Sequence, residues 1–316
     1  MSISAVAVVQ VLAGLLLLTF AADRLVLAAA RLSRLWGLSP ILIGAVVVGL
    51  GTSLPEMLVS GLAAARPAGM DLALGNIVGS NVANLSLVLG TSVILSPIAG
   101  QRLVLKREGR LMFLGSVLLV GLAWNNRLGI VEGVVLGSSL FLALGLMTYW
   151  SRIGGNGDVA AEVDDLTGSE AVRPGLEVVL GMASLGLTLL GARLLVAGAE
   201  EIAQELGISE AVIGLTLVAI GTSLPELATA LAAARRNEND LVLGNVLGSN
   251  LFNALGVGGV AGIVGNGAFA EDFHGPLLAM LGVSLLAGFL AVVGDRLDRW
   301  QGLVLLATYP LVVVFL

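Results

Sequence analysis

The chain is a succession of apolar runs of about 20 residues, separated by short polar segments. A membrane-spanning helix needs about 20 apolar residues to cross about 30 Å of hydrocarbon. The pattern predicts ten such helices, at roughly 5–30, 39–65, 72–96, 109–124, 128–150, 174–199, 208–234, 241–264, 276–294 and 300–316. The fourth run is the shortest. We therefore expect an all-α integral membrane protein.

One long hydrophilic stretch interrupts the series, at residues 151–173. It is rich in Gly, Asp and Glu, which is typical of a solvated linker. The stretch divides the chain into an N-terminal five-helix half (1–150), the linker (151–173) and a C-terminal five-helix half (174–316).

Composition agrees with a membrane environment. Hydrophobic residues make up 57% of the chain and charged residues only 12%, with a mean hydropathy of +1.00. The 43 glycines suit close packing between membrane helices. The chain has no cysteine, which excludes disulfides and thiolate metal sites. The first apolar run lacks a preceding basic region, so we expect a retained helix rather than a cleaved signal peptide.

Basic residues predict the orientation, because loops on the cytoplasmic side carry an excess of Lys and Arg. If loops alternate sides, the loops on the other side contain only Arg66 and Arg127. The expected topology places both termini outside the cell and the linker in the cytoplasm. The basic side has Arg31, Arg34, Arg102, Lys106, Arg107, Arg110, Arg152, Arg173, Arg235, Arg236, Arg296 and Arg299.

The two halves contain an internal repeat. Residues 44–56 align with 214–226 at an offset of 170, and residues 75–81 align with 244–250 at an offset of 169. Each half has an odd number of predicted spans, so the second repeat must cross the membrane in the opposite direction. Inverted repeats of this kind bind their substrate near the midplane, where the two repeats meet.

The repeats share the hexapeptide Gly-Thr-Ser-Leu-Pro-Glu, at 51–56 and 221–226. Pro55 removes a backbone donor, which frees carbonyls in the preceding turn. Thr52 and Glu56 are four residues apart, so the hydroxyl and the carboxylate share one helical face. Acids at membrane depth are rare and usually functional. The repetition of Glu56 as Glu226 indicates a shared cation site.

The next predicted span of each half adds a polar stripe. Asn76, Ser80 and Asn84 recur every four residues. The second half repeats the stripe as Asn245, Ser249 and Asn253. Facing the glutamates, these side chains offer amide and hydroxyl oxygens. Hard oxygen donors suit Ca²⁺ or Na⁺ rather than Zn²⁺ or Cu.

Simpler interpretations apply to some of these residues. A single Ser or Thr in a membrane helix often donates to the carbonyl four residues earlier. For Asn81 and Asn250, a hydrogen bond between helices is as plausible as contact with an ion. Asp23 and Arg193 lie within predicted spans, and we expect each to be paired or to extend to the interface.

With these motifs the chain resembles the cation/calcium exchanger superfamily, in particular the prokaryotic sodium/calcium exchangers. The resemblance rests on the two Gly-Thr-Ser-Leu-Pro-Glu motifs and on the two Gly-Asn-x-x-Gly-Ser-Asn motifs (75–81 and 244–250), and it extends over the whole chain. It implies four central ion sites, and a first and a sixth span that slide across a rigid core to alternate access.

The resemblance also implies the ligands. Glu56 and Glu226 would bind both Ca²⁺ and Na⁺. In many relatives one residue matching Asn84 or Asn253 is aspartate, whereas both are asparagine here. The predicted cage therefore has two carboxylates. Its other expected members are Thr52, Thr222, Ser53, Ser223, Ser80, Ser249, Asn84, Asn253 and the carbonyls of Gly49 and Ala219.

The sequence as a whole predicts a multi-pass cell-membrane antiporter that exchanges Na⁺ for Ca²⁺ by alternating access. Ca²⁺ and Na⁺ are expected as transported substrates in a lipid bilayer, with no cofactor, no nucleic acid and no obligate protein partner. A Ca²⁺ antiporter coupled to H⁺ with the same fold is the first alternative, and a passive cation channel is the second. An enzyme is not expected, because no nucleophile–base pair or cofactor motif is present.

Overall fold

The computed structural model describes residues 4–67, 69–99, 104–154, 173–206, 219–270, 273–293 and 296–313, and most of them are helical. Helices of the first half are α1 (Ala5–Trp36), α2 (Pro40–Ile43), η1 (Gly44–Gly49), α3 (Leu50–Thr52), α4 (Leu54–Ala64), α5 (Met70–Ala83), η2 (Asn84–Val88), α6 (Leu89–Leu95), η3 (Leu105–Gly109), α8 (Arg110–Ala123) and α9 (Ile130–Gly154). The second half has α11 (Pro174–Glu205), α13 (Ala219–Thr222), α14 (Leu224–Arg235), α15 (Asn239–Leu251), η5 (Phe252–Val257), α16 (Gly258–Gly265), α17 (His274–Val293) and α18 (Arg299–Val313). The elements labelled η are π-helices.

Two short antiparallel strand pairs connect the halves. Strand β1 (Ile98–Ala99) pairs with β4 (Arg296–Leu297), and β2 (Arg127–Leu128) pairs with β3 (Gly267–Ala268). The sequence analysis did not predict them, because a strand of two residues is too short to show an alternating pattern. Each pair joins a loop of one half to a loop of the other.

The helices agree with the predicted runs wherever the structure describes them. Six helices are long and apolar enough to cross a membrane, and a seventh span is added if the bent pair formed by 40–52 and 54–64 is taken as one. Of the remaining runs, the fourth is a continuous helical segment over 104–123, in which η3 leads directly into α8, and the described part of the tenth is the 15-residue helix α18. Residues 208–218 of the seventh run and residues 155–172 of the linker lie outside the described residues.

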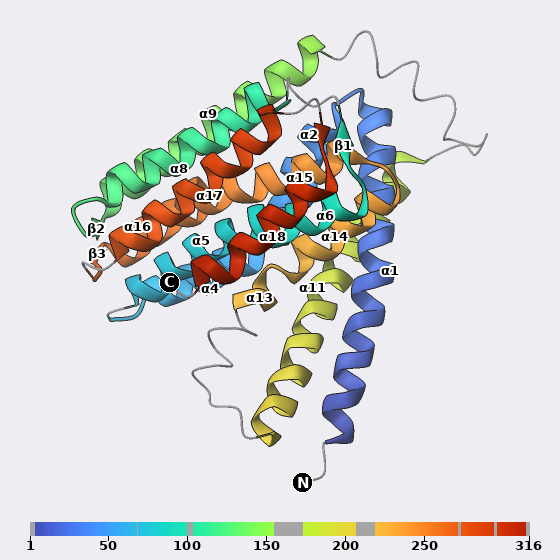
Figure 1. Cartoon of the computed structure of the whole chain (residues 1–316), viewed down its shortest axis with the longest axis horizontal. Helices are drawn as coiled ribbons and strands as arrows, with labels where there is room; N and C mark the ends of the chain where they lie inside the picture. Colours follow the sequence, from blue (N-terminus) through green and yellow to red (C-terminus); the bar gives the residue numbers. More distant parts are fainter. Residues whose placement is uncertain are drawn as a thin grey trace.

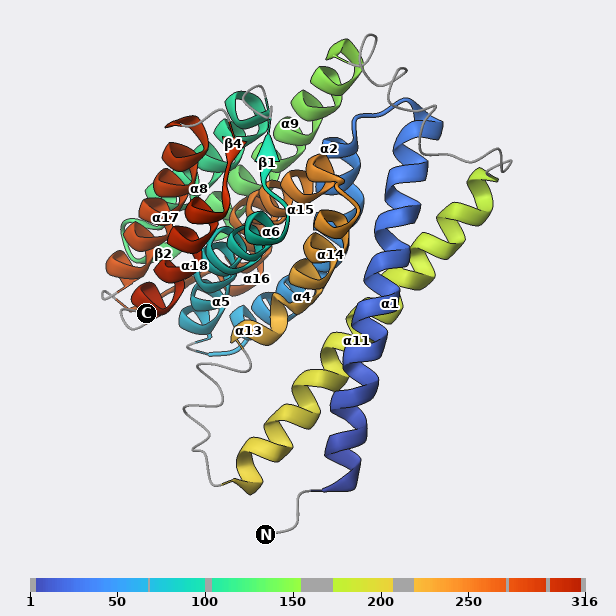
Figure 2. The same cartoon turned by 45° about the vertical axis from the view of Figure 1, so that its right-hand side comes forward.

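Helices α1 and α11 form a pair that stands beside the rest of the bundle (Figures 1 and 2). Three glycines let their backbones approach closely. A Cβ added to Gly14 would lie 2.6 Å from the Leu195 nitrogen, and one added to Gly198 would lie 2.6 Å from the Ala7 carbonyl oxygen. Gly191 is similarly tight against Leu18. Small residues at a helix interface are the usual way in which membrane helices pack.

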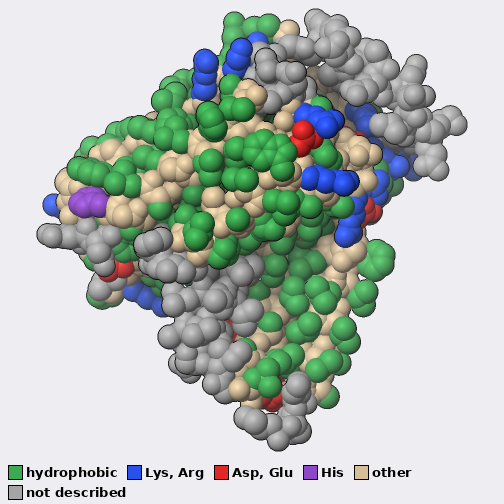
Figure 3. All heavy atoms as spheres, viewed as in Figure 1, with side chains coloured by type: hydrophobic (Ala, Val, Ile, Leu, Met, Phe, Trp, Pro, Cys, Tyr) green, Lys and Arg blue, Asp and Glu red, His purple; other side chains and the backbone are tan. Residues whose placement is uncertain are grey.

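The two helices that carry the polar stripes lie at the centre of the bundle. Within the apolar windows of 70–95 and 239–265, 78% and 89% of the residues are buried, compared with 28% and 33% in α1 and α11. The outer surface is broadly hydrophobic, and the Lys and Arg side chains visible in Figure 3 gather mostly toward its top and right edge. The structure is therefore a polar centre inside an apolar shell, as a bilayer requires.

The two halves interlock where η1 crosses α15. A Cβ on Gly248 would lie 2.4 Å from the Ala45 Cα, and one on Gly244 would lie 2.5 Å from the Ile41 carbonyl oxygen. On the η1 side of the contact, a Cβ on Gly44 would lie 3.1 Å from the Gly244 Cα. The close approach brings the backbone before Thr52 against the central helix of the other repeat.

We predict that Gly248→Ala destabilises the protein, because the added methyl group overlaps backbone that cannot move without separating the halves. Overpacking of this kind costs about 1–3 kcal/mol, so the midpoint of thermal unfolding in detergent should fall by several degrees. Gly282→Ala is the matched control, since a Cβ there meets nothing within 4 Å. Equal midpoints for the two variants would contradict the proposed interlock.

Candidate cation site

Each repeat has a helix that breaks at the serine of the shared hexapeptide. Ser53 separates α3 from α4 with φ −84° and ψ 4°, and Ser223 separates α13 from α14 with φ −90° and ψ 4°. In the first repeat the break bends the helix by 46°. Proline occupies the second position of the following helix in both cases. The sequence motif thus produces the same local structure twice.

The breaks place Glu56 and Glu226 in the first turn of α4 and α14. The N-terminus of a helix carries a partial positive charge, which favours a carboxylate at this position. Both side chains are nevertheless deeply buried, with exposed fractions of 1% and 0%. A carboxylate removed from water to this degree requires a compensating partner.

Two hydrogen bonds connect the motifs of the two repeats. The Ser53 hydroxyl donates to Oε1 of Glu226 at 3.1 Å. The Ser249 hydroxyl donates to the carbonyl of Gly49 at 3.3 Å. Residues that are 173 and 200 positions apart in the chain therefore lie next to each other where the two repeats meet.

Many oxygens of this site have no hydrogen-bond partner in the part of the chain that the structure describes. Leaving a buried polar group unsatisfied costs about 1–3 kcal/mol, and more for a charged one. A bound cation would satisfy several of these oxygens at once. The unpartnered atoms of the predicted residues are Oε1 and Oε2 of Glu56, Oε2 of Glu226, Oγ of Ser80 and Ser223, and the amide groups of Asn84 and Asn253.

The amides of Asn84 and Asn253 lie where the central helices widen. Asn84 begins η2, and Asn253 is the second residue of η5. Such π-helical turns often occur at functional sites. Both side chains are completely buried. Both asparagines are thus inside the structure, where their amide oxygens are neutral.

Asn76 and Asn245 have a role that the sequence analysis missed. The Asn76 amide donates to the Ser60 hydroxyl at 2.9 Å and to the Glu56 carbonyl at 3.5 Å. The Asn245 amide donates in the same way to the Thr229 hydroxyl and to the Glu226 carbonyl, both at 3.1 Å. These bonds hold the turn that carries each glutamate. Ser60 lies four residues after Glu56, and Thr229 lies three residues after Glu226. This spacing was the only sign in the sequence of the bonds that hold the two turns.

The remaining predicted ligands are less available. The Gly49 carbonyl accepts bonds from the Ser53 backbone, the Thr52 hydroxyl and the Ser249 hydroxyl, at 3.0, 3.3 and 3.3 Å. It would have to exchange one of these bonds to bind a cation. Thr52 also donates to the Val48 carbonyl, as expected for a hydroxyl in a membrane helix. Ala219 is the first described residue of α13.

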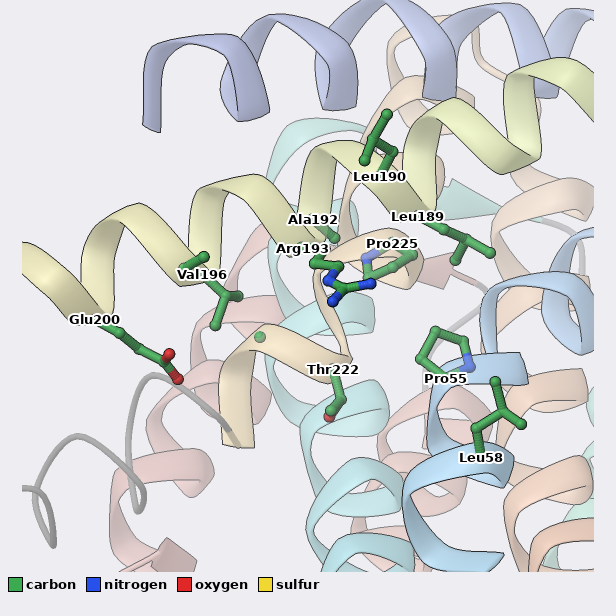
Figure 4. A pocket seen from close by; sticks show the side chains of 12 residues that line it. Pro55, Leu58, Leu189, Leu190, Ala192, Arg193, Val196, Glu200, Thr222 and Pro225 are labelled. Atoms are coloured by element: carbon green, nitrogen blue, oxygen red, sulfur yellow. The ribbon is translucent and has the colours of Figure 1, made fainter. Parts of the chain in front are cut away.

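A pocket of about 530 Å³ leads from the surface to the breaks of both helices (Figure 4). We call it the wide pocket. Its walls include Pro55, Thr222 and Pro225 from the two motifs. The opposite wall is α11, from which Arg193 and Glu200 extend into the pocket. The wide pocket therefore reaches residues that neighbour the two buried carboxylates in the chain, while Glu56 and Glu226 themselves do not line it.

Asp23 and Arg193, the two charged residues singled out within the spans, differ in their surroundings. Asp23 binds Arg236 through both carboxylate oxygens, at 2.7 and 2.6 Å, so it is paired as expected. Arg193 forms no hydrogen bond or ion pair with any residue that the structure describes. It is partly exposed and lines the wide pocket.

The donor set differs from that of a resident metal centre. Among the described residues no three His, Cys, Asp or Glu side chains gather to hold a metal ion. The site instead combines two carboxylates with hydroxyl and amide oxygens, which fits Na⁺ or Ca²⁺ as a transported substrate.

Comparison with known proteins agrees with this chemistry. The family model for the sodium/calcium exchanger protein matches residues 6–149 and again residues 176–316. The putative antiporter CaxA of Alkalimonas amylolytica is 38% identical, over 96% of each chain. The sodium/calcium exchanger MaX1 of Methanosarcina acetivorans is 31% identical, over 96% of this chain and 97% of its own.

A solved structure shows the same fold. The sodium-calcium exchanger NCX_Mj, soaked with Na⁺ and Sr²⁺, superposes with a TM-score of 0.84 at 34% identity, over 98% of both chains. Together with the two family matches and the buried site shared by the repeats, this similarity extends over the whole chain. The chain belongs to the sodium/calcium exchanger family, a family of membrane transporters that exchange cations for Ca²⁺.

Proposed function

We propose that this protein is a secondary antiporter that exchanges Na⁺ for Ca²⁺ by alternating access. The observation that carries the proposal is that two buried carboxylates, Glu56 of one repeat and Glu226 of the other, share one polar centre, in which Ser53 donates to Glu226. We call this group of buried oxygens the cage. Two carboxylates neutralise one Ca²⁺ or two Na⁺. The same cage can therefore hold either load with similar charge balance, which is the electrostatic requirement of an exchanger.

Na⁺ is the favoured coupling ion because the relatives with informative names use it. MaX1 is a sodium/calcium exchanger, and the NCX_Mj structures were obtained with Na⁺ together with Ca²⁺ or Sr²⁺. The neutral oxygens around the carboxylates also suit a bare Na⁺, which needs several ligands, better than a proton, which needs one. Coupling to H⁺ within the same fold is the alternative that transport experiments must separate.

We further propose ten spans in two inverted repeats, with both termini outside and the linker in the cytoplasm. The helix breaks at Ser53 and Ser223, which have nearly the same backbone angles, support the repeat. The odd number of predicted spans in each half supports its inversion. The excess of Arg and Lys on one set of loops supports the orientation. Under this topology the wide pocket, which includes Glu200 near the end of α11, opens to the outside.

Transport would follow from the exposure of the cage to one face at a time. In the present structure the cage lies beside the wide pocket. Movement of the α1–α11 pair along the bundle would close this pocket and open a path on the other face. The flat, glycine-rich contact within the pair allows the two helices to move together.

We predict Ca²⁺ uptake into proteoliposomes loaded with Na⁺ and diluted into Na⁺-free buffer, since outward movement of Na⁺ drives Ca²⁺ inward. ⁴⁵Ca²⁺ accumulation should vanish when Na⁺ is equal on both sides. A pH gradient without Na⁺ should drive no uptake. Uptake driven by the pH gradient alone would instead support H⁺ coupling, and unsaturable flux far above carrier rates would support a channel.

We predict that Glu56→Gln and Glu226→Gln each abolish stabilisation by Ca²⁺, because each removes one of the two charges that bind the ion. At a Ca²⁺ concentration 100 times Kd, binding stabilises a folded protein by about 2.7 kcal/mol, so the wild-type unfolding midpoint should rise by several degrees. Glu201→Gln is the control, as this acid lies on α11 outside the cage. A full Ca²⁺ shift in either cage variant would exclude that glutamate as a ligand.

A further inference from the structure

The wide pocket has a smaller counterpart related to it by the sequence repeat. This narrow pocket, of about 320 Å³, lies between α1 and α14. At the repeat offset of 170, Leu58 and Arg193 of the wide pocket correspond to Ala228 and Asp23 of the narrow pocket. The two pockets are therefore equivalent surfaces on opposite faces of the inverted repeat.

The two pockets differ in how closely they approach the cage. The wide pocket touches Pro55, Pro225 and Thr222, which flank the cage. The wall of the narrow pocket includes Leu224 but none of those three residues. Of these two pockets, both lined by residues that the structure describes, the wide one is the one that reaches residues flanking the cage.

Two ion pairs tie α1 to the core on the face of the narrow pocket. Arg236 follows α14, and its guanidinium binds both carboxylate oxygens of Asp23 at 2.7 and 2.6 Å. Arg34 binds Glu238, which precedes α15, at 3.2 Å. A bidentate pair between Arg and a carboxylate is the stronger and more directional kind of ion pair. We call these four residues the latch.

The opposite face has no equivalent of the latch in the sequence. The repeat offset relates Asp23 to Arg193 and Arg236 to Arg66. The counterpart of the strongest ion pair therefore consists of two cations, which cannot form an ion pair. Arg34 corresponds to Gln204, which is uncharged. The charges favour contact between the α1–α11 pair and the core on one face and provide no equivalent ion pair on the other.

A latch on α1 also holds α11, because the two helices are fastened at both ends. Glu177 of α11 accepts bonds from Arg24 at 2.7 Å and from Arg31 at 2.6 Å. At the other end, the Ser4 backbone donates to the Glu205 carboxylate at 2.9 Å. The glycine contacts fill the length between these two points. The pair therefore responds as one body to a force on either helix.

We propose that Asp23 and Arg236, assisted by Arg34 and Glu238, are positioning residues that set which face the cation site opens to. The ion pairs hold α1 against the core beside the narrow pocket, while the residues at the equivalent positions, Arg193 and Arg66, are both cations and cannot form such an ion pair on the face of the wide pocket. The inference rests on the proposed alternating access. It adds the residues that bias the exchange between its two states, and these residues do not touch the transported ions.

The absence of native cysteine allows a direct test by thiol labelling. Ala228→Cys reports on the narrow pocket and its repeat equivalent, Leu58→Cys, on the wide pocket. Rates of modification by a charged methanethiosulfonate reagent are measured on purified protein in detergent, with and without Asp23→Asn. Because partly exposed ion pairs are worth up to about 1 kcal/mol, loss of the latch should accelerate labelling at 228 about two- to fivefold and slow it at 58.

Two further variants separate the latch from general damage. Asp23→Arg combined with Arg236→Asp should restore the wild-type rates, because the pair is re-formed with its charges exchanged. Asp298→Asn removes the ion pair with Arg296, which involves no residue of α1, α11 or the latch, and should leave both rates unchanged. Unchanged rates in Asp23→Asn, equal acceleration at both reporters, or no rescue by the exchange would each overturn the proposal.

The labelling experiment needs no ion gradient, so its outcome is independent of the transport assay. A labelling shift without Na⁺-driven Ca²⁺ uptake would support the latch and contradict the proposed coupling of Ca²⁺ transport to Na⁺. Na⁺-driven Ca²⁺ uptake without a labelling shift would support the exchange and contradict the role proposed for the latch.

Discussion

The structure depends on the burial of two carboxylates at the centre of an apolar bundle. A carboxylate in hydrocarbon is stable only when hydrogen bonds, a counter-charge or loss of its own charge compensates for lost hydration. Glu56 and Glu226 have a helix N-terminus each, and Glu226 has the Ser53 hydroxyl, but most of their oxygens have no partner among the described residues. The missing partner is best supplied by a cation, and this requirement links the fold to transport.

Other features follow from the need to hold these two side chains in place. Each helix breaks at the serine that lies two residues before the proline, so that the glutamate lies in the first turn of the next helix. Asn76 and Asn245 then brace the turns from the neighbouring central helices. The glycines of η1 and α15 bring the halves close enough for a serine of one repeat to reach the glutamate of the other. The outer helices provide the apolar surface that the bilayer requires.

Much of this arrangement was predictable from the sequence, because inverted repeats and membrane spans leave strong patterns. The exact repetition of Gly-Thr-Ser-Leu-Pro-Glu predicted two equivalent helix breaks, and the structure confirms both. The bracing by Ser60 and Thr229 was missed, since a lone hydroxyl in an apolar helix has no distinctive pattern. The strand pairs were missed because two residues carry no periodicity. The unequal pockets also could not be predicted, because they depend on how α1 and α11 pack against α4 and α14 in three dimensions.

The central claim is that one cage, built from both repeats, holds Na⁺ and Ca²⁺ in turn. Calorimetric titration of the purified protein with Ca²⁺ at a series of Na⁺ concentrations tests it directly. If two Na⁺ ions and one Ca²⁺ compete for the same two carboxylates, the apparent Kd for Ca²⁺ should rise with the Na⁺ concentration. At high Na⁺ the apparent Kd should become proportional to the square of the Na⁺ concentration. A Ca²⁺ affinity that does not change with Na⁺, at constant ionic strength, would contradict a shared cage.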